Sequence, residues 1–197
     1  KKNILIAVPN DSLGGAEQYL KNIAEFFLKK EYLVTVLFLK TSTTRDWDTL
    51  KIHNNLNLIF TSSSSELKGV IPFLKNLIAL RKKKFNLIFT SHVFITGIIG
   101  FFIKLNIVKK EFFVGRESTS IFKRFKGLKL IRFKMSYFLG YSSLDLLVCQ
   151  TGFMKTQLVE ALPSLSKKIN IQVIPNPVNF EGILLNEKVD EKFGEFI

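Results

Sequence analysis

The sequence predicts an α/β protein with a Rossmann-like doubly wound parallel sheet of about seven strands and helices on both faces. Three observations support this fold class. Short apolar runs, which are typical of buried parallel strands, recur along the 197 residues. Segments with the apolar periodicity of amphipathic helices separate these runs. Polar residues follow several of the expected strands, and ligands bind beyond the carboxyl ends of strands in sheets of this kind.

The expected strands are apolar runs bounded by turn residues or charged residues. They cover residues 4–8, 33–39, 56–60, 85–90, 111–115, 146–149 and 169–174. Between the second and third strands the chain is polar, and Trp47 is expected to anchor this irregular loop. Cys149 is the single cysteine and lies in a strand, which predicts a buried thiol and excludes an internal disulfide.

The first two helices are recognised by an apolar stripe and by their start signals. The stripe of the first helix runs from Ala16 to Phe27 at the spacing of an amphipathic helix. The second helix is expected to begin near Pro72, because proline suits the first turn of a helix. Ser63 lies three residues before Glu66, which indicates a capping box just upstream.

Two later helices follow the fourth and sixth strands. Residues 93–108 are apolar but too short for a typical membrane span, so they predict a buried helix. Gly97 and Gly100 would let this helix lie close against the sheet. Thr151 is expected to cap a further helix, which Pro163 ends.

Gly14 and Gly15 stand at the turn from the first strand into the first helix. Two glycines at this point allow positive φ angles and a close approach of a ligand to the backbone. Free N–H groups at the start of a helix favour an anionic or hydroxyl-rich ligand. A tight turn without a ligand is an equally good interpretation of these two residues alone.

Three polar sets follow expected strands and are predicted to converge at one edge of the sheet. These sets are residues 10–15, 91–92 and 116–119. The formal net charge of +13 indicates an anionic partner, which could be nucleic acid, an acidic membrane or a phosphorylated substrate. With only two histidines and one cysteine, a zinc site is poorly supported, and no metal is expected.

Residues 121–142 predict one long basic helix without an acidic residue. Its apolar stripe is expected to pack inward and consists of Ile121, Phe125, Leu128, Ile131, Met135 and Phe138. Its cations are Lys123, Arg124, Lys126, Lys129, Arg132 and Lys134. Phe122, Leu130 and Phe133 lie off this stripe among the cations. The helix therefore presents either an ordinary solvated basic face or a surface suited to anionic lipid.

Three segments together resemble the opening half of the GT-B glycosyltransferases of family four, the "glycosyl transferases group 1", of the bacterial surface-polysaccharide type. The segments are GGAEQYLKNIAEFFLKKEYLVTVLFL at 14–39, LLVCQTGFMKTQL at 146–158 and VIPNPVN at 173–179. The resemblance implies retaining transfer of a sugar from a nucleotide-sugar, a UDP- or GDP-sugar, with no cofactor and no metal. It also implies an acceptor-binding domain at 1–179 and a linker or terminal segment at 180–197. The donor-binding C-terminal domain is expected to be absent from this chain, which alone should be inactive.

The resemblance also implies roles for single residues. Gly14 and Gly15 would lie near the donor diphosphate and the acceptor. His92 matches a histidine that commonly follows the fourth strand, and either contacts the ligand or caps a helix. Arg116 replaces a histidine of the family pattern and, with Ser118, would bind an acceptor phosphate or the donor diphosphate. Glu117 would bind an acceptor hydroxyl, although an ion pair with Arg116 or a lysine is favoured.

His92, Arg116 and Glu117 are the candidate catalytic residues, and they do not form a complete set. We expect an acceptor domain for a lipid-linked saccharide, such as one on undecaprenyl diphosphate, in O-antigen, lipopolysaccharide or capsule synthesis. Such an enzyme would be cytoplasmic and peripheral. It would bind to the anionic surface of the inner face of the cytoplasmic membrane. The alternatives are a transferase for a soluble acceptor and a non-catalytic nucleic-acid-binding module. Because no nucleic-acid recognition motif is present, a nucleic-acid partner is not expected.

Overall fold

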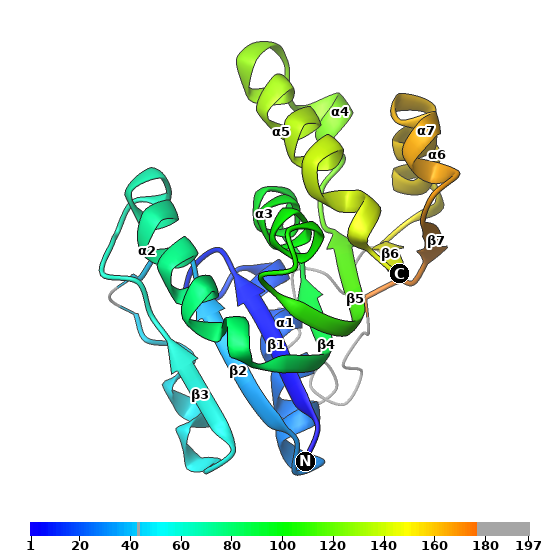
Figure 1. Ribbon diagram of the computed structural model, residues 1–197. Helices are drawn as coiled ribbons and strands as arrows, with labels where there is room; N and C mark the ends of the chain where they lie inside the picture. The colour runs from blue at the N-terminus through cyan, green and yellow to red at the C-terminus, as the bar shows by residue number, and fades with distance from the viewer. Residues whose placement is uncertain (43, 177–197) are drawn as a thin grey trace, which may run out of the picture.

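The computed structural model describes residues 1–42 and 44–176, which build one parallel sheet of seven strands (Figure 1). The strand order is β3-β2-β1-β4-β5-β6-β7. The strands are β1 (Asn3–Val8), β2 (Leu33–Phe38), β3 (Leu56–Ile59), β4 (Lys84–Thr90), β5 (Lys109–Glu117), β6 (Leu146–Cys149) and β7 (Asn170–Val173). This is the doubly wound sheet that the sequence predicts. The expected linker at 180–197 lies outside the described residues.

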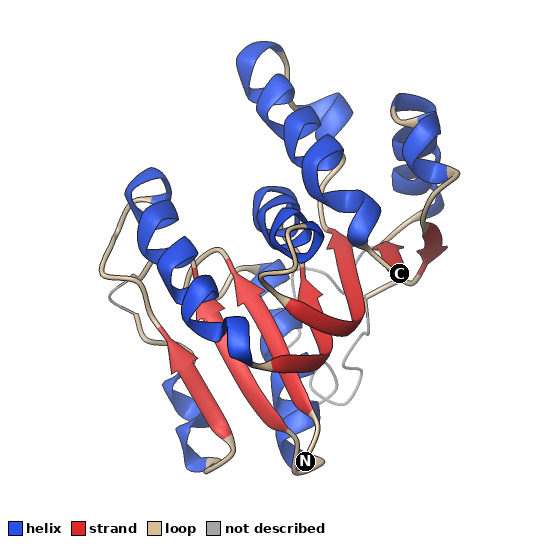
Figure 2. Ribbon diagram, in the orientation of Figure 1, coloured by secondary structure: helices blue, strands red, loops and turns tan. Residues whose placement is uncertain are grey.

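Helices cover both faces of this sheet (Figure 2). One face carries α1 (Gly15–Lys29) and the 3₁₀ segment η1 (Asp48–Ile52). The other carries α2 (Glu66–Ala79), α3 (Val93–Lys104), α5 (Gly127–Gly140) and α6 (Gly152–Ala161). The remaining short elements are η2 (Leu80–Lys82), α4 (Ile121–Arg124), η3 (Tyr141–Ser143) and α7 (Pro163–Ser166).

The alternation of side chains along the central strand explains the two hydrophobic layers. In β1, Ile4 and Ile6 face α1, whereas Leu5 and Ala7 face α2 and α3. All four are buried, and burying an Ile or Leu side chain contributes roughly 1.5–3 kcal/mol. The strand is therefore apolar throughout because both of its faces are covered.

Several local predictions are confirmed. Trp47 is fully buried and contacts the Phe38 ring edge-on, with 5.3 Å between ring centroids. Cys149 is a buried thiol, and burial raises its pKa to about 12. The Thr151 hydroxyl accepts a hydrogen bond from the Met154 backbone N–H at 3.2 Å, which caps α6. α3 is a largely buried helix, and no helix in the described part of the chain is long and apolar enough to cross a membrane.

α2 begins earlier than the sequence predicts, at Glu66 instead of near Pro72. Pro72 lies inside the helix, where it removes one backbone donor. The helix extends to both sides of this position because residues before and after it pack on the core: Gly69 is buried against the Leu39 backbone, Val70 packs on the core, and Phe73 and Leu77 are buried. The expected capping box does not form, since the Ser63 hydroxyl bonds to the backbone of Ser65 instead.

The single basic helix expected at 121–142 is broken into α4 and α5. Gly127 starts α5 with a φ angle of +57°, a left-handed conformation that favours glycine. The break changes the helical phase, so most of the expected inward stripe points to solvent: Leu128 is 80% exposed and Phe138 is 83% exposed. Leu130 and Phe133, which lie off that stripe, pack against the core instead. We call the exposed residues the α5 ridge: Leu128, Ile131, Met135, Phe138 and Leu139.

The glycines of α3 face α5 and not the sheet, contrary to the prediction. A Cβ atom on Gly100 would lie 2.1 Å from the carbonyl oxygen of Gly140, and one on Gly140 would lie 2.0 Å from that of Gly97. A Cβ on Gly97 would meet Ser136 at 2.7 Å. The two helices therefore touch backbone to backbone, which places α5 above the carboxyl edge of the sheet (Figure 1).

Candidate functional site

The three polar sets predicted from the sequence lie at the carboxyl edge of the sheet, toward which the strand arrows point in Figure 1. Two of them are in direct contact. Arg116 donates from Nη1 to the Ser91 hydroxyl at 2.9 Å, and the Ser118 hydroxyl donates to the Ser91 carbonyl at 3.4 Å. The first set, residues 10–15, leads into α1, and the ring of Tyr19 in α1 lies against the Arg116 guanidinium.

The glycine loop differs from expectation in its backbone. Gly14 is extended, with a φ angle of −96°, and Gly15 is the first residue of α1. Neither has a positive φ angle, so the turn itself does not require glycine at these positions. A Cβ on Gly15 would meet no atom within 4 Å, so this backbone is open to its surroundings. An open backbone at a helix start suits the close approach of a ligand.

Arg116 belongs to the end of β5 and is only 2% exposed. Its Nη2 group donates to the Asn176 side-chain carbonyl at 2.5 Å, and its guanidinium lies 4.2 Å from the centroid of the Tyr19 ring. Burial lowers the pKa of Arg116, yet an arginine remains charged at neutral pH. No carboxylate of the described residues forms an ion pair with this guanidinium, so its positive charge is buried without a counter-charge.

Glu117 is not paired with Arg116 or with a lysine, so the favoured ion pair is wrong. Adjacent residues of a strand point to opposite faces, and Glu117 turns toward α5 and η3. There its carboxylate accepts a hydrogen bond from the Tyr141 hydroxyl at 2.8 Å. Burial raises the pKa of Glu117 to about 7, although this hydrogen bond opposes the shift.

His92 lies at the start of α3, but its side chain does not cap the helix. Its backbone carbonyl accepts hydrogen bonds from the amide and the hydroxyl of Thr96, each at 2.9 Å. The Nδ1 atom is buried and has no hydrogen-bond partner among the described residues. Because burial lowers the pKa of His92, the imidazole is neutral at pH 7 and keeps a ring nitrogen available to a ligand.

Two neighbouring cavities at this edge share His92, Phe125 and Phe133. The inner chamber has a volume of about 210 Å³, and most of its lining residues are polar, including Ser91, Arg116, Glu117, Ser118, Thr119 and Arg124. The outer chamber has a volume of about 270 Å³ and lies between α2 and α5; its lining includes Leu67, Val70, Phe94, Lys129 and Arg132. Together they form one cleft with Arg116 and Arg124 at its inner end, and with Leu67, Val70 and Phe94 beside Lys129 and Arg132 farther out.

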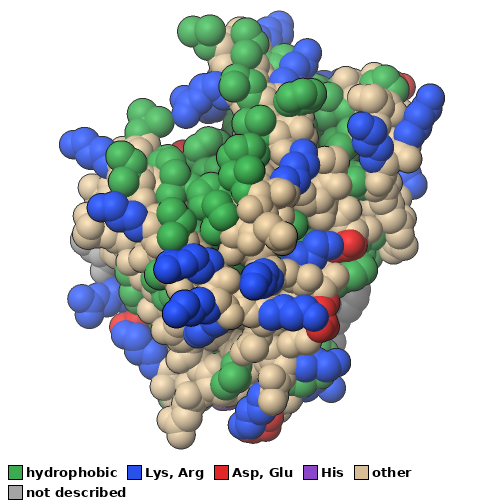
Figure 3. Space-filling view, viewed as in Figure 1, with side chains coloured by type: hydrophobic (Ala, Val, Ile, Leu, Met, Phe, Trp, Pro, Cys, Tyr) green, Lys and Arg blue, Asp and Glu red, His purple; other side chains and the backbone are tan. Residues whose placement is uncertain are grey.

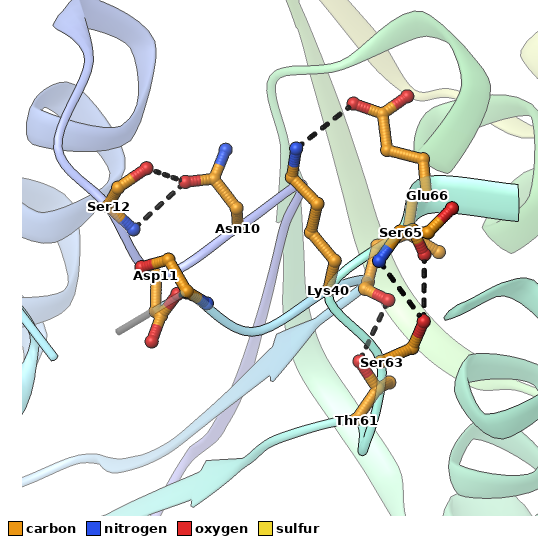
Figure 4. A network of polar contacts seen from close by, with 10 residues as sticks. Asn10, Asp11, Ser12, Lys40, Thr61, Ser63, Ser65 and Glu66 are labelled. Atoms are coloured by element: carbon orange, nitrogen blue, oxygen red, sulfur yellow. Dashed lines mark hydrogen bonds and ion pairs between the residues drawn. The ribbon is translucent and has the colours of Figure 1, made fainter. Parts of the chain in front are cut away.

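The loops beside this cleft are joined by a polar network (Figure 4). The Lys40 ammonium pairs with the Glu66 carboxylate at 3.6 Å, and Glu66 also lines the outer chamber. Asp11 is fully buried and accepts a hydrogen bond from the Ser42 amide through Oδ1. Its Oδ2 atom has no partner within the described residues.

Sequence reasoning placed Asp11 in the first polar set but gave it no role, and it did not connect Lys40, Glu66 or Tyr141 with this region. Lys40, Glu66 and Tyr141 come from separate parts of the chain: Glu66 lines the outer chamber, Lys40 pairs with Glu66, and Tyr141 binds Glu117.

The cations expected on the basic helix separate into different environments. Arg124 lines the inner chamber, whereas Lys129 and Arg132 line the outer chamber. Lys123 lies over the Phe153 ring, 4.4 Å from its centroid. Lys134 faces away from the cleft into another cavity, next to α7. The predicted membrane-surface set is therefore not one uniform face.

Three solved structures with this fold are glycosyltransferases. The lipopolysaccharide outer core galactosyltransferase WaaB, in its apo form, matches with a TM-score of 0.59 and 14% identity, over 90% of this chain and 46% of its own. UGT2 of Phytolacca americana, complexed with UDP-2fluoro-glucose and pterostilbene, matches with a TM-score of 0.56 and 11% identity, over 93% of this chain and 56% of its own. A UDP-glucosyltransferase from Polygonum tinctorium, in complex with 3,4-dichloroaniline, matches with a TM-score of 0.52 and 12% identity, over 89% of this chain and 52% of its own.

No protein-family model and no curated protein sequence matches the chain. The chain spans about half the length of the glycosyltransferase structures that it matches. At these identities the likeness is one of fold. The chain has the Rossmann-like, seven-stranded parallel sheet found in glycosyltransferases of the GT-B fold.

Proposed function

We propose that this chain is the acceptor-binding domain of a retaining GT-B glycosyltransferase of family four that extends a lipid-linked saccharide. The fold likeness supports sugar transfer in general. The observation that carries the proposal is the cleft, in which an inner chamber with two arginines adjoins an outer chamber with apolar walls and two further cations, Lys129 and Arg132. An acceptor on undecaprenyl diphosphate has the matching chemistry, with an anionic diphosphate next to an apolar chain.

The inner chamber would hold the diphosphate of such an acceptor. Its guanidinium groups are Arg116 and Arg124, and guanidinium binds phosphate oxygens through two parallel hydrogen bonds. A buried positive charge without a counter-charge is costly, and a bound anion would supply that counter-charge at Arg116. The neutral imidazole of His92 would accept or donate a hydrogen bond at an acceptor hydroxyl.

The outer chamber would receive the first part of the prenyl chain. Its walls are side chains of α2, α3 and α5 together with Phe125, and both α2 and α5 also carry exposed apolar residues. On α2 these are Leu67 and Ile71, which are 67% and 65% exposed, and on α5 they are the residues of the α5 ridge. In Figure 3, hydrophobic side chains gather over this part of the molecule, with Lys and Arg around them.

This arrangement suits a peripheral position on an anionic membrane, which we propose is the cytoplasmic face in a pathway for O-antigen or another surface polysaccharide. Apolar side chains with surrounding cations bind such surfaces through burial and through attraction to anionic lipids. The acceptor could then pass from the bilayer into the cleft without its chain crossing water.

The donor, a UDP- or GDP-sugar, would bind in the second domain of the same enzyme, with no requirement for a metal. The proposal therefore expects that the 197-residue chain alone transfers no sugar from either donor. Turnover above a blank without protein would contradict the assignment of donor binding to a second domain.

A binding measurement on the chain itself tests the acceptor site. Farnesyl diphosphate should bind more tightly than inorganic diphosphate or farnesol, because only the first fills both chambers. Arg116→Lys should weaken this binding by about 10- to 100-fold, because lysine cannot form the bidentate contact. Arg81 is an exposed arginine at the opposite edge of the sheet, so Arg81→Lys is the matched control and should have no effect.

Two results would contradict the proposal. Equal affinity for farnesyl diphosphate and diphosphate would remove the apolar chamber from the site and favour a soluble acceptor. Full affinity of the Arg116→Lys variant would remove Arg116 from phosphate binding.

A further inference from the structure

A third cavity lies apart from the cleft, on the other side of α5. It is an open hollow with a volume of about 390 Å³, bordered by α3, α5, η3 and the α6–α7 region. It shares no lining residue with the inner or the outer chamber. A ligand bound here would therefore not compete with an acceptor in the cleft.

The lining of this cavity is amphipathic. Three lysines, one from α3, one from α5 and one after α7, surround it: Lys104, Lys134 and Lys168. No acidic residue lines it. The walls are aromatic and aliphatic, formed by Phe101, Tyr137, Phe138, Leu139, Leu162 and Leu165. An anionic group bound to an apolar chain complements both features at once.

The position of the cavity indicates where such a ligand would come from. Phe138 and Leu139 belong both to this cavity and to the exposed α5 ridge. The cavity therefore opens beside the surface that is proposed to contact the membrane. At such a contact, membrane lipid would be available at high local concentration.

We propose that this cavity binds an anionic glycerophospholipid, with one acyl chain against the apolar wall and the phosphate near the three lysines. The proposal rests on the membrane contact included in the proposed function. Free phosphate would leave the apolar wall uncovered, and a zwitterionic lipid would provide no net negative charge for the lysines. A lipid held here would join α3, α5 and α7 and orient the domain while the cleft remains free.

The test uses lipids that stay monomeric, so that binding to the cavity is separated from binding to vesicles. The 197-residue chain is titrated with dihexanoyl-phosphatidylglycerol below its micellar concentration, and with dihexanoyl-phosphatidylcholine and glycerol 3-phosphate as comparisons. Methyl NMR shifts of Leu162 and Leu165 report the location of the bound lipid. The phosphatidylglycerol should bind about 10-fold more tightly than either comparison and should shift both methyl signals.

Charge reversal provides matched variants on the two sides of α5. Lys134→Glu with Lys168→Glu should weaken phosphatidylglycerol binding by about 10-fold or more. Lys129→Glu with Arg132→Glu makes the same change in charge beside the cleft and should leave the affinity unchanged. All four side chains are exposed, so neither double variant should unfold the domain.

Three outcomes would overturn the proposal: equal affinity for both phospholipids, affinity for glycerol 3-phosphate equal to that for phosphatidylglycerol, or equal losses in the two double variants. Arg116→Lys separates the two sites, because it should weaken binding of farnesyl diphosphate and leave binding of phosphatidylglycerol unchanged. A failure of the acceptor site would thus be seen separately from a failure of the lipid cavity.

Discussion

Arg116 and Glu117 show how one step along a strand separates two buried charged groups. They are consecutive in β5, so their side chains lie on opposite faces of the sheet. Arg116 meets Tyr19, Ser91 and Asn176, whereas Glu117 meets Tyr141. Neither can neutralise the other. Arginine stays charged, while the carboxylate responds to burial through a pKa that rises to about 7.

The first prediction follows from the sign of this shift. The pKa of Glu117 is about 7 in the folded protein and has an ordinary value of 4.5, so the folded state holds the proton more tightly than the unfolded state. The free energy of unfolding should therefore decrease as the pH rises from 4.5 to about 7. Glu117→Gln removes this titration and should stabilise the domain by roughly 3 kcal/mol above pH 7, with little effect near pH 4.5.

Urea unfolding at low and at neutral pH measures this difference. Glu160→Gln, at an exposed position of α6, is the matched control and should give curves parallel to those of the wild type. A stabilisation by Glu117→Gln that is equal at both pH values would show that the carboxylate does not titrate in this range.

At the scale of the elements, the crossing of α3 and α5 is the contact that supports the cleft. Gly140→Ala would place a methyl group 2.0 Å from a backbone oxygen of α3, and backbone cannot move aside as a flexible side chain can. The variant should lose about 1–3 kcal/mol of stability and displace α5. Gly152→Ala, where a Cβ meets no atom within 4 Å, is the control and should be nearly neutral. Equal melting temperatures for the two variants would contradict this account of the crossing.

The strands were predictable because a buried parallel strand leaves a continuous apolar run. The helices were less predictable where packing overrides a local signal. Pro72 suggested a helix start, but Gly69 and Val70, which precede it, pack against the core and belong to α2. Gly127 carried the information for the break before α5, yet a single glycine within a periodic pattern does not reveal its φ angle.

The location of the candidate site was predictable from the sequence, whereas most of its side-chain contacts were not. Polar residues after β1 and β4 and at the end of β5 indicated the correct edge, because parallel strands end together. Tyr141, which donates a hydrogen bond to Glu117, lies 24 residues later in the chain, after α4 and α5. The break between these two helices, which sets the direction of their side chains, was not predicted. The two-chamber cleft depends on the same helix pair.

At the scale of the whole molecule, the α5 ridge and the neighbouring cations of α5 and its N-cap predict salt-sensitive binding to anionic vesicles. Each cation near such a surface contributes on the order of 1 kcal/mol, and salt screens this attraction. The chain should sediment with phosphatidylglycerol vesicles at low salt and poorly with phosphatidylcholine vesicles. Reversing Lys126, Lys129 and Arg132 to glutamate should leave it in the supernatant.

The control for this experiment reverses three other cations, Arg81, Lys82 and Lys83, which precede β4 at the opposite edge of the sheet. This variant has the same net charge as the first and should still sediment. If both variants lose binding equally, the attraction comes from the net charge of +13 and not from the α5 surface.

The location of a bound prenyl chain is the most direct test of an acceptor cleft with a phosphate end and an apolar end. A farnesyl diphosphate analogue with a photoreactive group in its chain would be crosslinked to the 197-residue chain and mapped by mass spectrometry. We predict labels within 66–70 and 125–133, the parts of α2 and of the α4–α5 region that border the outer chamber. Excess inorganic diphosphate should reduce them. Labels within 162–168, or labels spread over the surface and unaffected by diphosphate, would contradict the proposed acceptor site.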